Sequence, residues 1–133
     1  MRIKELRICY LTPQNFYDIP KGLVGENEEP VKACAREAAE ETGLMIREEE
    51  LIDLGRHPYT KEKDLHLFAL VRKELPDTKD MKCTSFFLDR AGRKIPEVDG
   101  FRYITVDEKE GYLVKSMVDV IDKAQAQKQL FLS

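Results

Sequence analysis

Apolar and polar residues alternate along the chain in a pattern that predicts several short strands. Runs rich in strand-forming residues occur at residues 6–11 (LRICYL), 51–54 (LIDL), 64–71 (DLHLFALV), 83–88 (CTSFFL) and 101–106 (FRYITV). Segments rich in polar residues, glycine and proline separate these runs, as is typical of loops and turns. We therefore expect strands on both sides of the middle of the chain.

Two segments show the period of an amphipathic helix. In the first, Pro30 to Thr42, apolar residues recur every three or four positions, Pro30 suits the first turn, and Gly43 suits the position after the last. The second covers residues 112–130, with helix-spaced apolar residues at Leu113, Met117, Val120, Ile121 and Ala124. Strands before and after a central helix, with a second helix at the end, predict an α/β (α+β) fold.

The first helical segment also carries a face of acidic residues. Glu37, Glu40 and Glu41 stand at positions i, i+3 and i+4, so their carboxylates share one side of the helix. Like charges at this spacing repel by roughly 0.2–0.5 kcal/mol per pair. A solvated acidic face is the common interpretation of an isolated Glu-Glu pair. A divalent cation such as Mg²⁺, which takes oxygen ligands and bridges carboxylates to phosphates, is the alternative.

The wider stretch, residues 22–44 (GLVGENEEPVKACAREAAEETGL), favours the cation. It reads as glycine, five residues, glutamate, seven residues, Arg-Glu, two residues, Glu-Glu, one residue, glycine and an aliphatic residue. This spacing resembles the Nudix box of the Nudix hydrolases, which cleave nucleoside diphosphates linked to another group. Ala38 is the one departure, since a larger aliphatic residue is usual there. The box positions are Gly22, Glu28, Arg36, Glu37, Glu40, Glu41, Gly43 and Leu44.

The resemblance implies an α/β/α sandwich with a mixed sheet, and it implies roles for the box. Glu37, Glu40 and Glu41 would bind Mg²⁺ or Mn²⁺, and a backbone carbonyl at Lys21 or Gly22 would add a ligand. Glu28 would hold a metal-bound water or brace the loop. We expect Arg36 to orient a box glutamate through a charge-assisted hydrogen bond.

Nudix hydrolases usually recruit a further acid from outside the box. We expect Glu97 to be this acid, because it precedes a strand-like run and follows a glycine-containing turn. An ordinary exposed loop acid is the alternative interpretation. Three other acids are weaker candidates: Glu74, Asp77 and Asp80. Which carboxylate acts as the general base stays open.

Signals for the substrate conflict. The residues before the box, Ile19-Pro20-Lys21-Gly22, resemble those of dinucleoside polyphosphate hydrolases and diphosphoinositol hydrolases, and Lys21 would meet the substrate. Tyr59, sixteen residues after Gly43, resembles a base-stacking tyrosine of the former, whereas Pro58 resembles a proline of ADP-ribose hydrolases. Two lysines in the segment that follows, Lys61 and Lys63, would supply charges to a phosphate chain, and an ordinary solvated loop is the equal alternative.

We therefore expect a metal-dependent pyrophosphohydrolase of a nucleotide, with a dinucleoside polyphosphate as the favoured substrate. ADP-ribose and nucleoside triphosphates are the alternatives. A non-catalytic nucleotide-binding module is a further alternative, although such modules typically lose box glutamates.

Composition narrows these expectations. A chain of 133 residues fits one domain over residues 1–133. The net charge of −3, without a basic patch, argues against nucleic-acid binding. Three scattered cysteines favour a reducing cytoplasm over a disulfide framework. No apolar run approaches the ~18 residues of a membrane span, and the first residues lack a signal-peptide pattern.

One departure from the resemblance bears on assembly. Nudix hydrolases usually carry an additional strand before the run at residues 6–11. Because an unpaired sheet edge is a liability, we expect either that the early residues take over this role or that a second subunit completes the sheet. A homodimer is therefore a hypothesis, and sedimentation showing only monomer at micromolar concentration would remove it.

Overall fold

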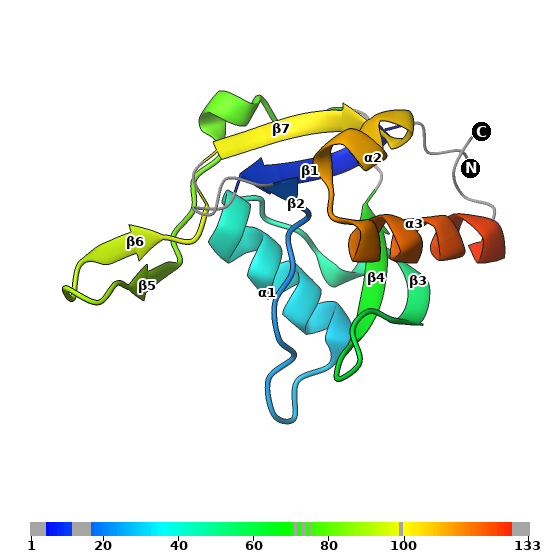
Figure 1. Cartoon of the computed structure of the whole chain (residues 1–133), viewed down its shortest axis with the longest axis horizontal. Helices are drawn as coiled ribbons and strands as arrows, with labels where there is room; N and C mark the ends of the chain where they lie inside the picture. Colours follow the sequence, from blue (N-terminus) through cyan, green and yellow to red (C-terminus); the bar gives the residue numbers. More distant parts are fainter. Residues whose placement is uncertain are drawn as a thin grey trace.

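The computed structural model describes residues 5–11, 17–70, 72, 74, 76–98 and 100–128, and Figure 1 shows their arrangement. Its strands are β1 (Glu5–Leu11), β2 (Tyr17–Asp18), β3 (Leu51–Pro58), β4 (Asp64–Leu70), β5 (Phe86–Leu88), β6 (Lys94–Pro96) and β7 (Gly100–Thr105). Its helices are α1 (Pro30–Thr42), α2 (Lys109–Tyr112) and α3 (Lys115–Lys128), with short 3₁₀ turns η1 (Glu48–Glu50), η2 (Thr78–Asp80) and η3 (Val106–Glu108). None of the helices in these ranges is long and apolar enough to cross a membrane.

The strands form three antiparallel groups. Strand β1 lies between β2 and β7, and β3 pairs with β4 over a long hairpin that is irregular between Asp53 and Arg56. Gly55 lies at this irregularity with a φ of 92°, a conformation that favours glycine. The α/β class is confirmed. Parallel pairing, expected for a mixed sheet, does not occur among the strands in the described ranges, because every register there is antiparallel.

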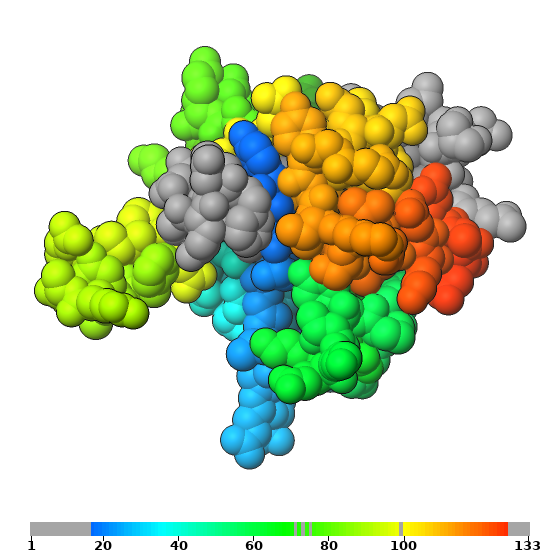
Figure 2. Space-filling view, in the orientation of Figure 1, coloured from blue at the N-terminus to red at the C-terminus, as the bar shows by residue number. Residues whose placement is uncertain are grey.

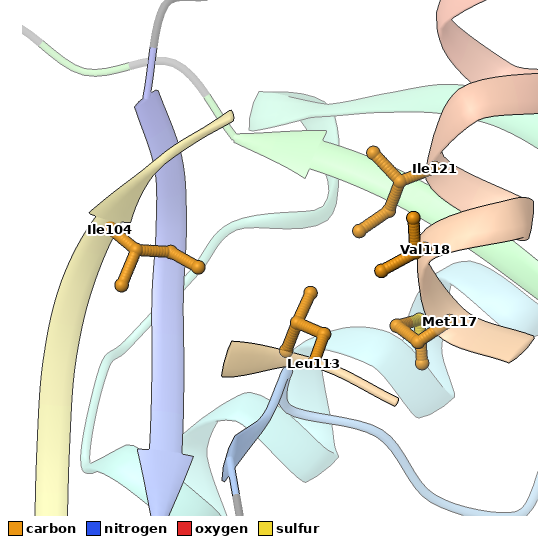
Figure 3. Close-up of a cluster of buried hydrophobic side chains, with 5 residues drawn as sticks. All are labelled: Ile104, Leu113, Met117, Val118 and Ile121. Carbon is orange, nitrogen blue, oxygen red and sulfur yellow. The ribbon is translucent and has the colours of Figure 1, made fainter. Parts of the chain in front are cut away.

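Helix α3 joins the strand groups through a shared apolar core. Ile104 of β7 points toward Leu113 and the α3 side chains in Figure 3. Other α3 residues, Val120 and Ala124, pack against Leu54 of β3 and the β4 side chains. One face of α3 therefore covers both the β7 side and the β3–β4 hairpin, as its apolar period predicts.

Helix α1 begins and ends where the sequence predicts. Pro30 occupies the first turn, and Gly43 adopts a left-handed φ of 77° with its N–H donating to the carbonyl oxygen of Ala39 at 2.9 Å. Leu44, directly after the helix, packs against Leu70 and Met81. These contacts fix the C-terminal end of α1 beside β4 and the segment that follows β4.

Two expectations from the sequence need correction. The strand expected at residues 83–88 is confined to Phe86–Leu88, where it pairs with the unexpected β6 in a hairpin that projects from the body (Figures 1 and 2). Its apolar residues are exposed, because apolar content alone does not show which side faces a core. The helix expected over residues 112–130 is divided, since Leu113 takes an extended conformation between α2 and α3. Residues after Lys128 lie outside the described ranges.

Leu54 tests the contribution of the α3–β3 interface to stability. This side chain is 1% exposed. Replacing it with alanine removes buried methyl groups and leaves a cavity, so Leu54→Ala should lower the free energy of unfolding by about 2–5 kcal/mol in urea denaturation. Leu88→Ala is the control, because Leu88 is 67% exposed and should change stability by no more than about 0.5 kcal/mol. Equal losses in the two variants would contradict this core assignment.

Candidate functional site

Arg36 of α1 ties the glycine-rich loop, residues 19–29, to the helix. Its Nε and Nη2 atoms each lie 2.9 Å from a carboxylate oxygen of Glu28, and Nη2 also donates to the carbonyl oxygen of Leu23 at 3.1 Å. Glu28 in turn accepts the N–H of Gly25 at 2.7 Å. The guanidinium and this N–H lower the pKa of Glu28 to about 2, so the clamp between loop and helix stays charged at neutral pH.

Arg36 also contacts two glutamates on its own helix. Its Nη1 lies 2.8 Å from Oε1 of Glu37 and 3.5 Å from Oε2 of Glu40. The guanidinium therefore offsets part of the repulsion among the acidic residues of α1. A cation that bound these oxygens would compete with Arg36 for them.

The backbone of the glycine-rich loop lies directly against two of the carboxylates. A Cβ atom at Gly22 would overlap the carboxyl group of Glu37, so glycine is required for this approach. One residue earlier, the N–H of Lys21 donates to Oε2 of Glu41 at 3.0 Å. Glu41 is 3% exposed. The loop thus covers Glu37 and Glu41 and shields these two carboxylates from bulk water.

The segment after β4 connects Glu97 to the helix that carries the box glutamates. Residues 82–85 of this segment form hydrogen bonds both to the end of α1 and to Glu97. The N–H groups of Lys82 and Thr84 donate to the carbonyl oxygens of Thr42 and Glu40, at 3.0 and 2.7 Å, at the end of α1. Farther along, Ser85 accepts the Glu97 N–H at 3.1 Å, and its hydroxyl lies 3.3 Å from Oε2 of Glu97. The segment after β6 that carries Glu97 is therefore attached, through Ser85 and Thr84, to the C-terminal turn of the helix.

The electrostatics show that three carboxylates act on one another. Burial and the negative charges of Glu37 and Glu97 raise the pKa of Glu41 to about 8, against the lowering effect of Lys21. Burial also raises the pKa of Glu37, where Arg36 opposes the shift and Glu40 and Glu97 add to it. Glu97 therefore lies within electrostatic reach of both box glutamates.

This carboxylate cluster, Glu37, Glu41 and Glu97, fits a hard divalent cation. Its donors are carboxylate oxygens, and its shared negative charge is partly removed from water, so a cation would lower its free energy. In the ranges that the structure describes, no three His, Cys, Asp or Glu side chains already form a compact metal-binding group. An ion that bound Oε1 of Glu37 would replace the contact that this oxygen makes with Arg36.

Other residues singled out in the sequence lie at varying distances from this cluster. The Lys21 ammonium pairs with the Asp18 carboxylate at 3.2 Å. Tyr59 is half-buried and packs against the α3 core. Against the lowering effect of burial, Asp18 raises the pKa of Lys21, and Tyr59 adds a smaller raising effect. The turn between β3 and β4 carries Lys61 and Lys63, which are exposed. Among the weaker candidates for the outside acid, Asp77 caps η2 by accepting the N–H of Lys79 at 3.0 Å, and Glu74 and Asp80 are exposed.

Sequence reasoning missed Asp18 and Ser85. Asp18 is almost completely buried at the end of β2, and Ser85 holds both the backbone and the side chain of Glu97. The three-residue separation of Asp18 and Lys21 is a weak signal for an ion pair. Ser85 lies in a run that reads as an ordinary strand, so its sequence context carries no such signal.

Comparison with known proteins identifies the family. The NUDIX domain profile matches residues 7–123, so the chain belongs to this family. A crystal structure of a C. elegans Ap4A hydrolase binary complex has a similar fold, with a TM-score of 0.54 and 17% identity over 92% of this chain and 81% of that one. An uncharacterized 17.7 kDa protein of Enterobacteria phage T4, from the e-segB intergenic region, is 37% identical over 91 residues. That match covers 66% of this chain and 60% of the phage protein.

The raised pKa of Glu41 makes stability depend on pH. Because the folded-state pKa, about 8, exceeds the ordinary value of 4.5, this group contributes stability below pH 4.5 that is lost as pH rises through 8. In EDTA, the free energy of unfolding should fall between pH 5 and pH 9, by on the order of a few kcal/mol from this group. Urea denaturation at a series of pH values measures the decrease.

Glu41→Gln should remove much of that decrease, because glutamine does not ionise and still offers an oxygen to the Lys21 N–H. The control is Glu40→Gln on the exposed side of the cluster, which makes the same change of charge one residue away. An equal pH dependence in Glu41→Gln and the unmodified protein would contradict the buried-carboxylate account.

Proposed function

We propose that the protein is a divalent-metal-dependent pyrophosphohydrolase that cleaves a nucleoside diphosphate linked to another moiety through attack of water on phosphorus. The observation that carries this proposal is the carboxylate cluster beneath the glycine-rich loop, in a chain of the NUDIX family. Separate parts of the sequence supply these acids, and all of them are electrostatically coupled. Such a cluster suits a divalent cation that is coordinated both by protein carboxylates and by the oxygens of a bound diphosphate.

The proposed ligands are Glu37, Glu40, Glu41 and Glu97, with a carbonyl oxygen of the loop at Gly22. Mg²⁺ is the proposed ion, and Mn²⁺ should replace it. When bound, the ion neutralises phosphate charge and makes a coordinated water easier to deprotonate. The general base is one of these carboxylates.

The remaining residues of the box would hold this arrangement in place. Arg36 and Glu28 keep the glycine-rich loop against α1, and Gly22 leaves room for the carboxyl group of Glu37. Gly43 ends the helix and lets the chain turn toward Leu44. A non-catalytic nucleotide-binding module would have no need for this set of clustered acids, which favours the enzyme.

A dinucleoside polyphosphate is the proposed substrate. The C. elegans protein of similar fold is an Ap4A hydrolase, and Tyr59 lies near Lys21 at the edge of the cluster. Lys61 and Lys63, exposed on the neighbouring turn, would attract a long phosphate chain. ADP-ribose and nucleoside triphosphates are the alternative substrates, the former on the strength of Pro58.

A nucleotide panel tests this function directly. The protein should release nucleoside phosphates from a dinucleoside polyphosphate with Mg²⁺ and release none with chelator. Running the reaction in ¹⁸O-water shows which product carries the solvent oxygen and hence which phosphorus is attacked. Metal-independent turnover, or no turnover of any nucleotide with Mg²⁺ or Mn²⁺, would contradict the proposal.

Glu37→Gln should lower kcat/KM by at least about 100-fold. Loss of a residue that only hydrogen-bonds to a metal ligand already lowers activity by about 10–100-fold, and Glu37 is a proposed ligand itself. The fold should persist, because the side chain lies at the loop interface and not in an apolar core cluster. Circular dichroism and thermal melting check the fold. Glu49→Gln, at an exposed position in η1, is the control and should keep normal activity. Near-normal activity of Glu37→Gln would remove it from the proposed ligands.

Glu97→Gln separates the proposed extra acid from its rival. We expect a loss of kcat/KM of about tenfold or more in Glu97→Gln, because its charge acts on both Glu37 and Glu41. Glu74→Gln makes the same change at an exposed position and should have little effect. The reverse order of effects would assign the role to Glu74.

A further inference from the structure

Asp18 is a buried acid outside the Nudix box. It ends β2 and is 4% exposed, although charged residues are almost never fully buried unless they are paired. Its Oδ1 accepts the N–H of Ile19 at 2.9 Å, and its Oδ2 lies 3.2 Å from Nζ of Lys21. Both carboxylate oxygens are therefore directed toward the three residues that follow β2.

Lys21 is held from two sides. Its side chain pairs with Asp18, while its backbone N–H donates to Glu41 at 3.0 Å. The intervening Pro20 restricts the backbone of this short segment. The ion pair thus closes residues 18–21 into a loop whose far end is attached to the carboxylate cluster.

The next residue extends this connection to a second carboxylate. Gly22 follows Lys21 directly, and a Cβ atom there would overlap the Glu37 carboxyl group and force it to move. A shift of the Lys21 backbone would therefore disturb the contacts of both Glu41 and Glu37. Two of the proposed metal ligands depend on where this one residue is held.

The ion pair also bears on what the Lys21 ammonium does. If it left Asp18 to bind a phosphate, the carboxylate would stay buried without its cationic partner, which is strongly unfavourable. The Lys21 side chain is 35% exposed, whereas that of Asp18 is 6% exposed. Separating the pair would therefore cost more free energy at the buried Asp18 carboxylate than at the Lys21 ammonium, which water can reach. The geometry therefore favours a lysine that stays on Asp18.

We infer that Asp18 is a positioning residue for the metal site. Its ion pair with Lys21 fixes the loop backbone against Glu41 and Glu37 and thereby sets the affinity for the divalent cation, and Lys21 serves as a brace and not as a phosphate ligand. This inference rests on the proposed function, because it presumes that the carboxylate cluster binds a cation.

Mn²⁺ titration followed by electron paramagnetic resonance tests the inference without relying on activity. Asp18→Asn keeps an oxygen for the Ile19 N–H and removes the charge, while Lys21→Met removes the ammonium and keeps the backbone N–H. Each should weaken Mn²⁺ binding by about tenfold or more, as expected for groups that orient metal ligands. The double variant should be no more than about twofold weaker than either single one, because both remove the same interaction.

Two further variants control for charge and folding. Asp119→Asn breaks an exposed pair of the same type, Lys115–Asp119 at 3.1 Å in α3, and should leave Mn²⁺ affinity within about twofold of the unmodified protein. Lys21→Arg keeps a cation beside Asp18 and should retain most of the affinity. Thermal melting in EDTA shows that each variant is folded under the conditions of the titration.

The outcomes separate the inference from the proposed function. Unchanged Mn²⁺ affinity in folded Asp18→Asn would overturn the inference, and so would a Lys21→Met variant that raises KM for the nucleotide and binds Mn²⁺ normally. Failure of the unmodified protein to bind Mn²⁺ would overturn the proposed function and the inference together. Weakened Mn²⁺ binding in both single variants, without further loss in the double variant, supports Asp18 as the positioning residue.

Discussion

The site depends on holding like-charged carboxylates together beneath a loop backbone. Glu41 is buried, and Glu37 lies against Gly22. The negative charge of Glu97 contributes to the raised pKa of both glutamates. Removing negative charges from water beside one another is unfavourable, so the surrounding contacts must offset that cost. Arg36 supplies part of this compensation at Glu37 and Glu40, and the Lys21 N–H supplies part of it at Glu41.

The rest of the fold keeps the parts of this site in place. Leu44 anchors the end of α1 among Leu70 and Met81, and the segment after β4 makes hydrogen bonds to the last carbonyl oxygens of the helix. Because that segment leads to Ser85 and Glu97, the end of the helix and the outside acid share one attachment. On the other side, β2 delivers the glycine-rich loop to the same helix through the Asp18–Lys21 pair. Elements distant in sequence thus meet on one face of α1.

Local periodicity predicted much of this arrangement, and long-range contacts account for what it missed. The bounds of α1 follow from the apolar spacing, Pro30 and Gly43, and the shared face of its glutamates follows from helix geometry alone. Neither signal shows that Glu41 is buried under Lys21, since the loop covers it through contacts twenty residues apart. Burial of Asp18 and exposure of Phe86 and Leu88 likewise depend on neighbours elsewhere in the chain, which is why the sequence did not reveal them.

Crystals soaked with Mn²⁺ would test the central claim most directly, through the anomalous scattering of the ion. The claim is that the carboxylate cluster and the loop above it form one site for divalent cations. It predicts a strong anomalous peak in contact with carboxylate oxygens of Glu37 and Glu41, on the side where Glu97 and the Gly22 backbone meet them. At saturating Mn²⁺, a protein that showed no peak there, or a peak only at other acids, would contradict it.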